Sequence, residues 1–167
     1  FGVAPTLEMS AEIRRIELQL LTGAFDFGRI EGRLSGRVDD LVLVGWEPQR
    51  MRLALATSTE DPGRRRISQR AVQNLADLGG GLQGAVSALF LRFFDDFGYR
   101  RLGFACDLEG RVCRMSGVVD QADDSFVLVQ GGGVPRIDVI GHNRRVDWPE
   151  LIRRLNAVRG GPGPVVQ

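Results

Sequence analysis

The feature that most constrains this chain is a period-two alternation of apolar and polar residues in its first third. The alternation runs through residues 16–20 and again through residues 51–56. Because successive side chains of a strand point to opposite faces, each stretch predicts a half-buried antiparallel strand with one apolar face. The apolar positions are Ile16, Leu18 and Leu20 in the first stretch and Met51, Leu53 and Leu55 in the second.

Glycine, aspartate and proline residues separate further segments with the character of short strands. Residues 30–37 and 41–44 lie between the two alternating stretches, and residues 126–129 and 136–140 flank a run of three glycines. Residues 104–115 predict a β-hairpin that turns at Glu109–Gly110. Strands that recur at near-regular spacing favour a meander.

Two segments carry both a helical apolar spacing and capping residues. Residues 67–78 have Ser68 as a candidate N-cap and the glycines at 79–81 as a stop signal. A short terminal helix is expected to open at Asp147, with Glu150 three residues later in the position of a capping box. The apolar stripe of this terminal helix consists of Trp148, Leu151, Ile152 and Leu155.

Residues 82–97 predict a second central helix with a strongly aromatic face. Polar residues interrupt this segment, so it lacks the roughly 20 mostly apolar residues that a transmembrane helix needs. It carries a single cation, Arg92, which does not favour an anionic membrane surface. We therefore expect its phenylalanines to pack on the sheet. They are Phe90, Phe93, Phe94 and Phe97.

Together these patterns predict an α+β fold. We expect a twisted, largely antiparallel sheet of about six to eight strands, two central amphipathic helices and a short C-terminal helix. Residues 1–158 form one β-rich domain in this interpretation, and residues 159–167 form a mobile tail of glycine and proline. Because the chain begins with Phe1, we interpret it as the terminal module of a longer protein whose targeting segment lies elsewhere.

Composition and charge restrict the class of function. The chain is 43% hydrophobic and 26% charged, which is typical of a soluble globular domain. Its formal net charge is +1, so no strong field attracts nucleic acid, and we expect no nucleic-acid partner. All the basic residues are arginines, whose planar guanidinium groups can bind carboxylate or phosphate in two-point contacts.

Signals of enzymatic chemistry are weak. The single histidine, His142, is not accompanied by a Gly-x-Ser-x-Gly signature, so a structural role is favoured over activation of a nucleophile. Asp95 and Asp96 are adjacent and would not face each other on a helix. The glycine run at 79–81 is not followed by the lysine of a phosphate-binding loop, and two cysteines with one histidine do not complete a zinc site. We expect no catalytic residues, no metal and no cofactor.

The two cysteines predict a disulfide. If Glu109 and Gly110 form a two-residue turn, Cys106 lies directly opposite Cys113, within the range that a disulfide spans. The alternative is that they are two small core residues, since free cysteines are often buried. A disulfide would place the protein in an oxidising compartment, which in a bacterium is the periplasm.

Several segments resemble the carboxy-terminal part of large AsmA-like bacterial envelope proteins, and within them the YdbH-like, TamB-related branch that carries the label "dicarboxylate transport". The resemblance extends from about residue 25 to residue 155. It rests on FGRIEGRLSG at 27–36, LVLVGWEP at 41–48, RISQRAV at 66–72, FLRFF at 90–94 and GGGVPRIDVIGHNRRVDW at 131–148.

The resemblance implies a fold and a function. Members of this family are described as long curved β-sheets, anchored in the inner membrane, with an apolar trough along which phospholipid moves towards the outer membrane. The chain would then be a non-catalytic periplasmic end module, with the six apolar positions of the alternating stretches facing phospholipid. The alternative is a structural domain that carries no lipid and binds a small outer-membrane lipoprotein by β-strand addition. A packed core requires the same alternation as a lipid trough, so the pattern alone leaves both open.

Overall fold

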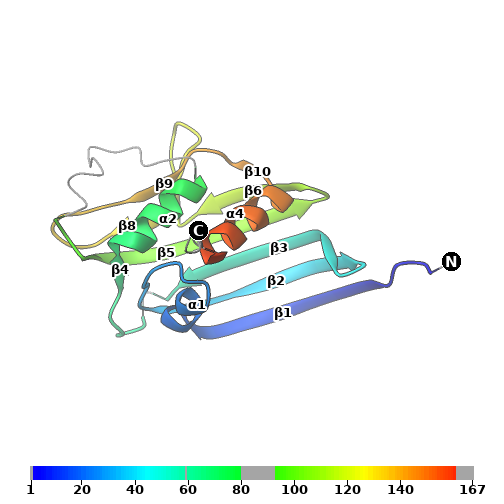
Figure 1. Cartoon of the computed structure of the whole chain (residues 1–167), viewed down its shortest axis with the longest axis horizontal. Coiled ribbons are helices and arrows are strands. Elements are labelled where there is room, and N and C mark those ends of the chain that lie inside the picture. The colour runs from blue at the N-terminus through cyan, green and yellow to red at the C-terminus, as the bar shows by residue number, and fades with distance from the viewer. Residues whose placement is uncertain (1, 59, 80–92, 161–167) are drawn as a thin grey trace, which may run out of the picture.

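The computed structural model describes residues 2–58, 60–79 and 93–160, which form an α+β fold around a large antiparallel sheet (Figure 1). The helices are α1 (Leu18–Ala24), α2 (Gln69–Gly79) and α4 (Trp148–Gly160). The long strands are β1 (Thr6–Glu17), β2 (Arg33–Val44), β3 (Glu47–Thr57), β5 (Asp96–Glu109), β6 (Val112–Gly117) and β8 (Phe126–Gly131). The short strands are β4 (Arg66–Ser68), β7 (Val119–Asp120), β9 (Val139–Gly141) and β10 (Arg145–Asp147).

The predicted fold class and the C-terminal helix are confirmed, but the sheet is larger than predicted. In the described part of the chain it has 10 strands, in which β1, β2, β3, β5, β6 and β10 follow one another in space and every pair is antiparallel. Besides most of β1, the strands that the sequence analysis did not identify are β4, β7 and β10, which contain two or three residues each. Such short segments show no alternation in the sequence, because they are held by their neighbours rather than by their own pattern.

The 14-residue strand β5 joins the two parts of the sheet. Its first half pairs with β4 and β8, and its second half pairs with β3 and β6. At the change of partner β6 passes close to β8, since a Cβ atom at Gly117 would overlap the carbonyl oxygen of Val127. The absence of a side chain at this position therefore permits the close approach.

The main core lies between the β5–β8–β9 part of the sheet and α2. It includes Ile67, Ala71, Val72, Phe97, Val129 and Val139, with Leu155 of α4 packed against it. In Figure 1, α2 and α4 lie in front of this half of the sheet, whereas β1, β2 and β3 run below them with α1 at one end. A smaller cluster of Met51, Cys106, Leu108 and Cys113 continues the core beneath Trp148, the first residue of α4.

Two predicted helix starts are confirmed. The Ser68 hydroxyl accepts a hydrogen bond from the backbone N–H of Ala71 at 3.2 Å, as an N-cap does at the third helical residue. The Asp147 carboxylate accepts a bond from the N–H of Glu150, also at 3.2 Å. Both side chains stabilise N–H groups that have no partner within the helix.

The predicted strand at residues 16–20 is wrong beyond Glu17. The chain turns there into α1, whose buried residues Leu18 and Thr22 are four apart, as one face of a helix requires. The Thr22 hydroxyl donates to the carbonyl oxygen of Leu18 at 2.9 Å, and Leu20 on another face is 75% exposed. The apolar positions of residues 18–24 fit both the two-residue period of a strand and the 3.6-residue period of a helix. The contact of Leu18 with the core favours the helix.

The predicted aromatic helix is wrong at its C-terminal end. Phe97 lies in β5, opposite Ile67 of β4, and is buried in the core. Phe93 lies in a turn and is 81% exposed, so it does not point at the sheet, whereas Phe94 packs against the core. Phe90 and the body of this predicted helix lie outside the described residues, as do residues 161–167 of the predicted tail.

The Asp96 carboxylate makes two contacts at the residue where β5 begins. Asp96 accepts a hydrogen bond from Nε of Arg66 at 2.8 Å and another from Arg29 at 2.9 Å. The bond from Arg66, together with the nearby positive charges, lowers the pKa of Asp96. These arginines hold the start of β5 against β4 and the segment that precedes β2.

We expect Gly117→Ala to lower the free energy of unfolding by about 1–3 kcal/mol, because the new methyl group overlaps the backbone of β8. Urea denaturation of the purified chain measures this change. The matched control is Gly23→Ala in α1, where no atom lies within 4 Å of the new Cβ and the helix should gain about 0.5–1 kcal/mol. Equal effects of the two substitutions would contradict the assignment of close packing to Gly117.

Candidate functional site

The first component of the site is an apolar surface on β1, β2 and β3. We call it the open apolar face. It is formed by Leu7, Met9 and Ile13 of β1, by Val38, Leu41 and Leu43 of β2, and by Leu53 and Leu55 of β3. Leu7 is 46% exposed and Met9 is 42% exposed, while the other six side chains are partly buried.

Strand register places these residues on one face. Leu7 lies opposite Leu43, and Met9 lies opposite Leu41. Further along, Val38 lies opposite Leu53, which in turn lies opposite Cys106 of β5. Directly opposed side chains in an antiparallel pair share a face, so these cross-strand rows form a continuous surface. No charged residue lies in the rows named here.

A bulge at Asp40 keeps the apolar side chains of β2 in phase. Asp40 has a positive φ of 51°, and the register between β2 and β3 shifts beside it. Leu41 thereby packs against the same cluster as Val38, although the two residues are three positions apart in the strand. The extra residue of a bulge changes the direction of the side chains that follow it.

The reverse face of the same strands is charged. Asp39 lies opposite Arg52, Arg52 opposite Asp107, and Asp107 opposite Arg114, so that the signs alternate across four strands. Arg52 also pairs with Asp40. Opposed charges of opposite sign stabilise a sheet surface in water. The reverse face is therefore suited to solvent, and the sheet is amphipathic.

The second component of the site is a cavity of about 500 Å³ between α2, α4 and the sheet. This size lies within the range of about 300–1,000 Å³ that is usual for small-molecule sites. The side chains on its walls are mostly apolar and come from the two helices and several strands. They include Phe27, Leu75, Leu78, Phe104, Met115, Phe126, Leu128, Val146, Leu151 and Leu155.

Polar side chains also line this cavity, and they are Asn143, Arg145 and Asp147 in and before β10 and Glu150 and Arg154 of α4. Nε of Arg154 donates to Glu150 at 2.9 Å, and Arg153 forms a second ion pair with the same carboxylate. Hydrogen bonds from Arg154 and Arg153 lower the pKa of Glu150. The Arg154 side chain is 53% exposed, so this charged edge of the cavity is in contact with solvent.

The cavity and the open apolar face share a floor. Phe104 lines the cavity and lies opposite Leu55, while Met115 lines the cavity and lies opposite Cys106. Met115 also packs, with Leu53, against the smaller core cluster. An apolar chain could therefore pass from the open face to the cavity without crossing a charged row.

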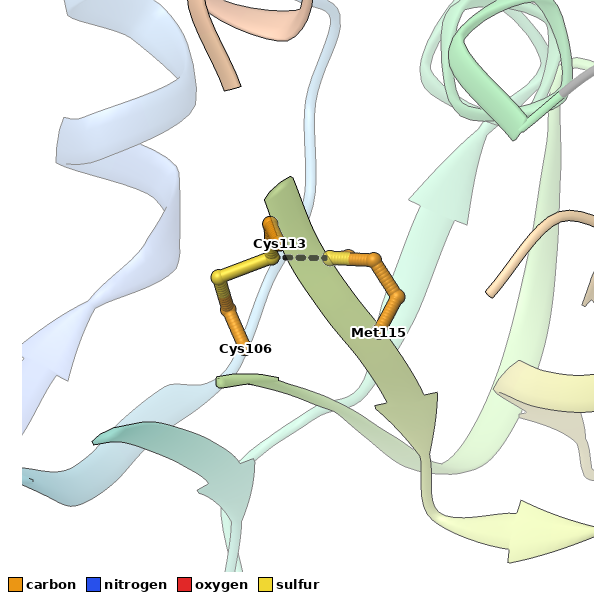
Figure 2. The surroundings of a disulfide bond; sticks show 3 residues. All are labelled: Cys106, Cys113 and Met115. Carbon is orange, nitrogen blue, oxygen red and sulfur yellow. Dashed lines mark hydrogen bonds between the residues drawn. A yellow bond between two sulfur atoms is a disulfide. The ribbon is translucent and has the colours of Figure 1, made fainter. Parts of the chain in front are cut away.

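The predicted disulfide between Cys106 and Cys113 is present, with Cα atoms 5.6 Å apart (Figure 2). The predicted register is wrong by two residues, because the turn is formed by Gly110 and Arg111. Cys113 therefore lies opposite Leu108, and Cys106 lies opposite Met115. The bonded cysteines are diagonal neighbours on the same face. Sγ of Cys113 lies 3.3 Å from Sδ of Met115, which carries the apolar surface past the disulfide.

The structure brings some of the predicted lipid-facing residues together and separates others. Met51, Leu53 and Leu55 alternate on one face of β3, as predicted, with Met51 buried and the other two partly buried. Ile16 is 40% exposed and lies opposite Leu34, in the row that continues to Thr57. Leu18 and Leu20 belong to α1 and are not part of this surface.

Sequence reasoning missed the first strand. Residues 7–13 alternate as clearly as residues 51–55 do, and that signal would have identified Leu7, Met9 and Ile13. The cavity had no comparable signal, because its walls come from segments far apart in the chain.

His142 is exposed, and Asp96 is held by two arginines. Among the described residues no group of three histidine, cysteine, aspartate or glutamate side chains could hold a metal ion. No helix in the described part of the chain is long and apolar enough to cross a membrane.

Comparison of the chain with protein-family models, with curated proteins and with solved structures finds no match.

The disulfide closes a short loop, and we expect it to contribute about 2–3 kcal/mol to the free energy of unfolding. A reducing agent should lower the stability of the native chain by about this amount in urea denaturation. The matched control is the double variant Cys106→Ala, Cys113→Ala, whose stability should not respond to the reducing agent. A native chain that is equally stable under both conditions would contradict this prediction.

Proposed function

We propose that this chain is the non-catalytic terminal module of an AsmA-like envelope protein, and that it shields phospholipid acyl chains or hands them on in the periplasm. The observation that carries the proposal is the open apolar face, which no charged row interrupts and whose floor continues into an apolar cavity. The resemblance of the sequence to the AsmA-like family supports the same proposal.

The energetics favour hydrocarbon as the occupant of this face. Each methylene group removed from water contributes about 0.8 kcal/mol, and an acyl chain needs only an apolar surface of tolerant shape. A charge within the rows would be costly to desolvate, and the charged side chains lie on the reverse face instead. A contiguous exposed apolar surface of this kind marks an interaction site in soluble proteins.

The disulfide supports the proposed compartment. Disulfides persist in oxidising environments such as the bacterial periplasm and are rare in the cytosol. The Cys106–Cys113 bond is therefore consistent with a location outside the cytoplasm. In the proposal the parent protein is anchored in the inner membrane, and this module lies towards the outer membrane.

The edge of β1 favours a second candidate, a docking domain without lipid. Among the described strands β1 pairs only with β2, so the backbone groups along its other edge are available to a partner. Strand addition to such an edge is a common mode of peptide recognition. A small outer-membrane lipoprotein is the partner that the family resemblance suggests.

Photo-crosslinking to lipid tests the two candidates. A photoreactive amino acid replaces Leu53 in the purified chain, which is then illuminated with vesicles of phosphatidylethanolamine and phosphatidylglycerol. We expect mass spectrometry to find a phospholipid adduct, because Leu53 lies on the open apolar face. The matched control is the same substitution at Arg52, the next residue of β3, which faces the charged side and should give no adduct.

Three outcomes distinguish the proposals. An adduct at position 53 alone supports the lipid-handling module. Equal adducts at both positions, or crosslinks at position 53 only to the chain itself, would refute it. If no lipid adduct forms and a lipoprotein crosslinks to an outward-facing position of β1, the docking domain is the function that remains.

A further inference from the structure

We infer that the cavity between α2, α4 and the sheet binds one acyl chain of an amphiphile, whose polar head group lies at the Arg154–Glu150 edge. This inference deepens the proposed function and rests on it, because the open apolar face would deliver the chain to the cavity. The cavity is a separate site, because none of its lining residues comes from β1, β2 or β3.

Most side chains on the walls are apolar and favour hydrocarbon, and the polar ones are Asn143, Arg145, Asp147, Glu150 and Arg154. Leu75 and Leu78 of α2, Leu128 of β8 and Leu151 of α4 offer neither hydrogen-bond donors nor acceptors in their side chains. A ligand with polar groups in its buried part would lose hydrogen bonds to water without replacing them. Apolar cavities also hold water poorly, since a bound water needs two to four polar partners. A flexible alkyl chain needs no hydrogen bonds and can therefore occupy the apolar part of this cavity.

The polar edge restricts the head group. The guanidinium of Arg154 can donate two hydrogen bonds to a carboxylate or a phosphate. Its present partner, Glu150, also pairs with Arg153, so Arg154 can change partner while Glu150 stays neutralised. Because the ion pair is exposed to solvent, its exchange has a small energetic cost. A fatty acid and a phospholipid both carry a suitable anionic group.

The floor supplies a route between the two sites. Phe104 and Met115 line the cavity. Phe104 lies opposite Leu55 of the open apolar face, and Met115 is separated from Leu53 by Cys106. A chain lying on the open face can therefore enter the cavity while it stays in contact with apolar side chains. The open face would cover an acyl chain before that chain enters the cavity.

A fluorescent fatty acid, cis-parinaric acid, tests the inference on the purified, delipidated 167-residue chain. We expect saturable binding, and we expect Leu151→Trp to weaken it by at least about tenfold, because the indole fills the volume that about two methylene groups occupy. The matched control is Ile152→Trp on the neighbouring position of α4, which does not line the cavity and should bind as the native chain does. If Leu151→Trp does not fold, Leu128→Phe fills the same cavity from the sheet.

The outcomes separate this inference from the proposed function. Absence of saturable binding, or equal binding by the native chain and the folded cavity-filling variants, overturns the cavity as an acyl-chain site. Phospholipid adducts at position 53 would be unaffected by that result, since Leu53 does not line the cavity. Conversely, cavity binding without adducts at position 53 overturns the open face as a lipid surface.

Competition identifies the source of the chain. Displacement of cis-parinaric acid by oleate alone assigns the cavity to free fatty acids. Displacement by lysophosphatidylethanolamine as well assigns it to membrane lipid. Arg154→Gln should weaken oleate binding while the binding of an uncharged alkane chain is retained, and equal loss of both would remove the head-group role of Arg154.

Discussion

The constraint on which the rest of the structure depends is the apolar face of one large sheet. A sheet with one apolar face must cover that face with helices, with another sheet or with ligand. Here α2 packs on the main core around β5, β8 and β9, and Trp148 of α4 packs on a smaller cluster that reaches Met51 of β3. The part built on β1, β2 and β3 extends beyond these helices (Figure 1). The candidate functional site exists because the helices cover only part of the apolar face of the sheet.

Strand β5 makes the unequal cover possible. It is long enough to pair with β4 and β8 in one half and with β3 and β6 in the other. The helices pack where the strands around β8 are concentrated, and the long antiparallel strands continue the sheet away from them. The cavity lies between these two parts, where α4, Phe104 and Met115 line the same space. Both components of the site therefore depend on the same change of partner.

Regular local patterns could be predicted from the sequence, and features set by tertiary contacts could not. Features that depend on nearby residues were identified correctly. They are the alternation of Met51, Leu53 and Leu55 and the helix caps at Ser68 and Asp147. The helix that begins at Leu18 was missed because its sequence fits both a strand and a helix. Burial of Leu18 in the core favours the helix, and the sequence alone does not show that burial. The disulfide pairing was predicted with the wrong register, because a turn one residue further along moves every opposed pair by two. The cavity requires the packing of two helices against distant strands.

A packed core and an exposed apolar surface require the same alternation of side chains. In this sheet the buried part of the apolar face continues directly into the exposed part. Met51 is buried beneath Trp148. Leu53, two residues further along β3, is partly buried, and Met9 on the edge strand is 42% exposed. Burial thus decreases from β5 towards β1 while the chemistry of the face stays constant. The covered residues stabilise the fold, and the same surface, continued past the helices, remains available to hydrocarbon. In the proposed function this surface would hold an acyl chain, because the core beside it already keeps its strands in register.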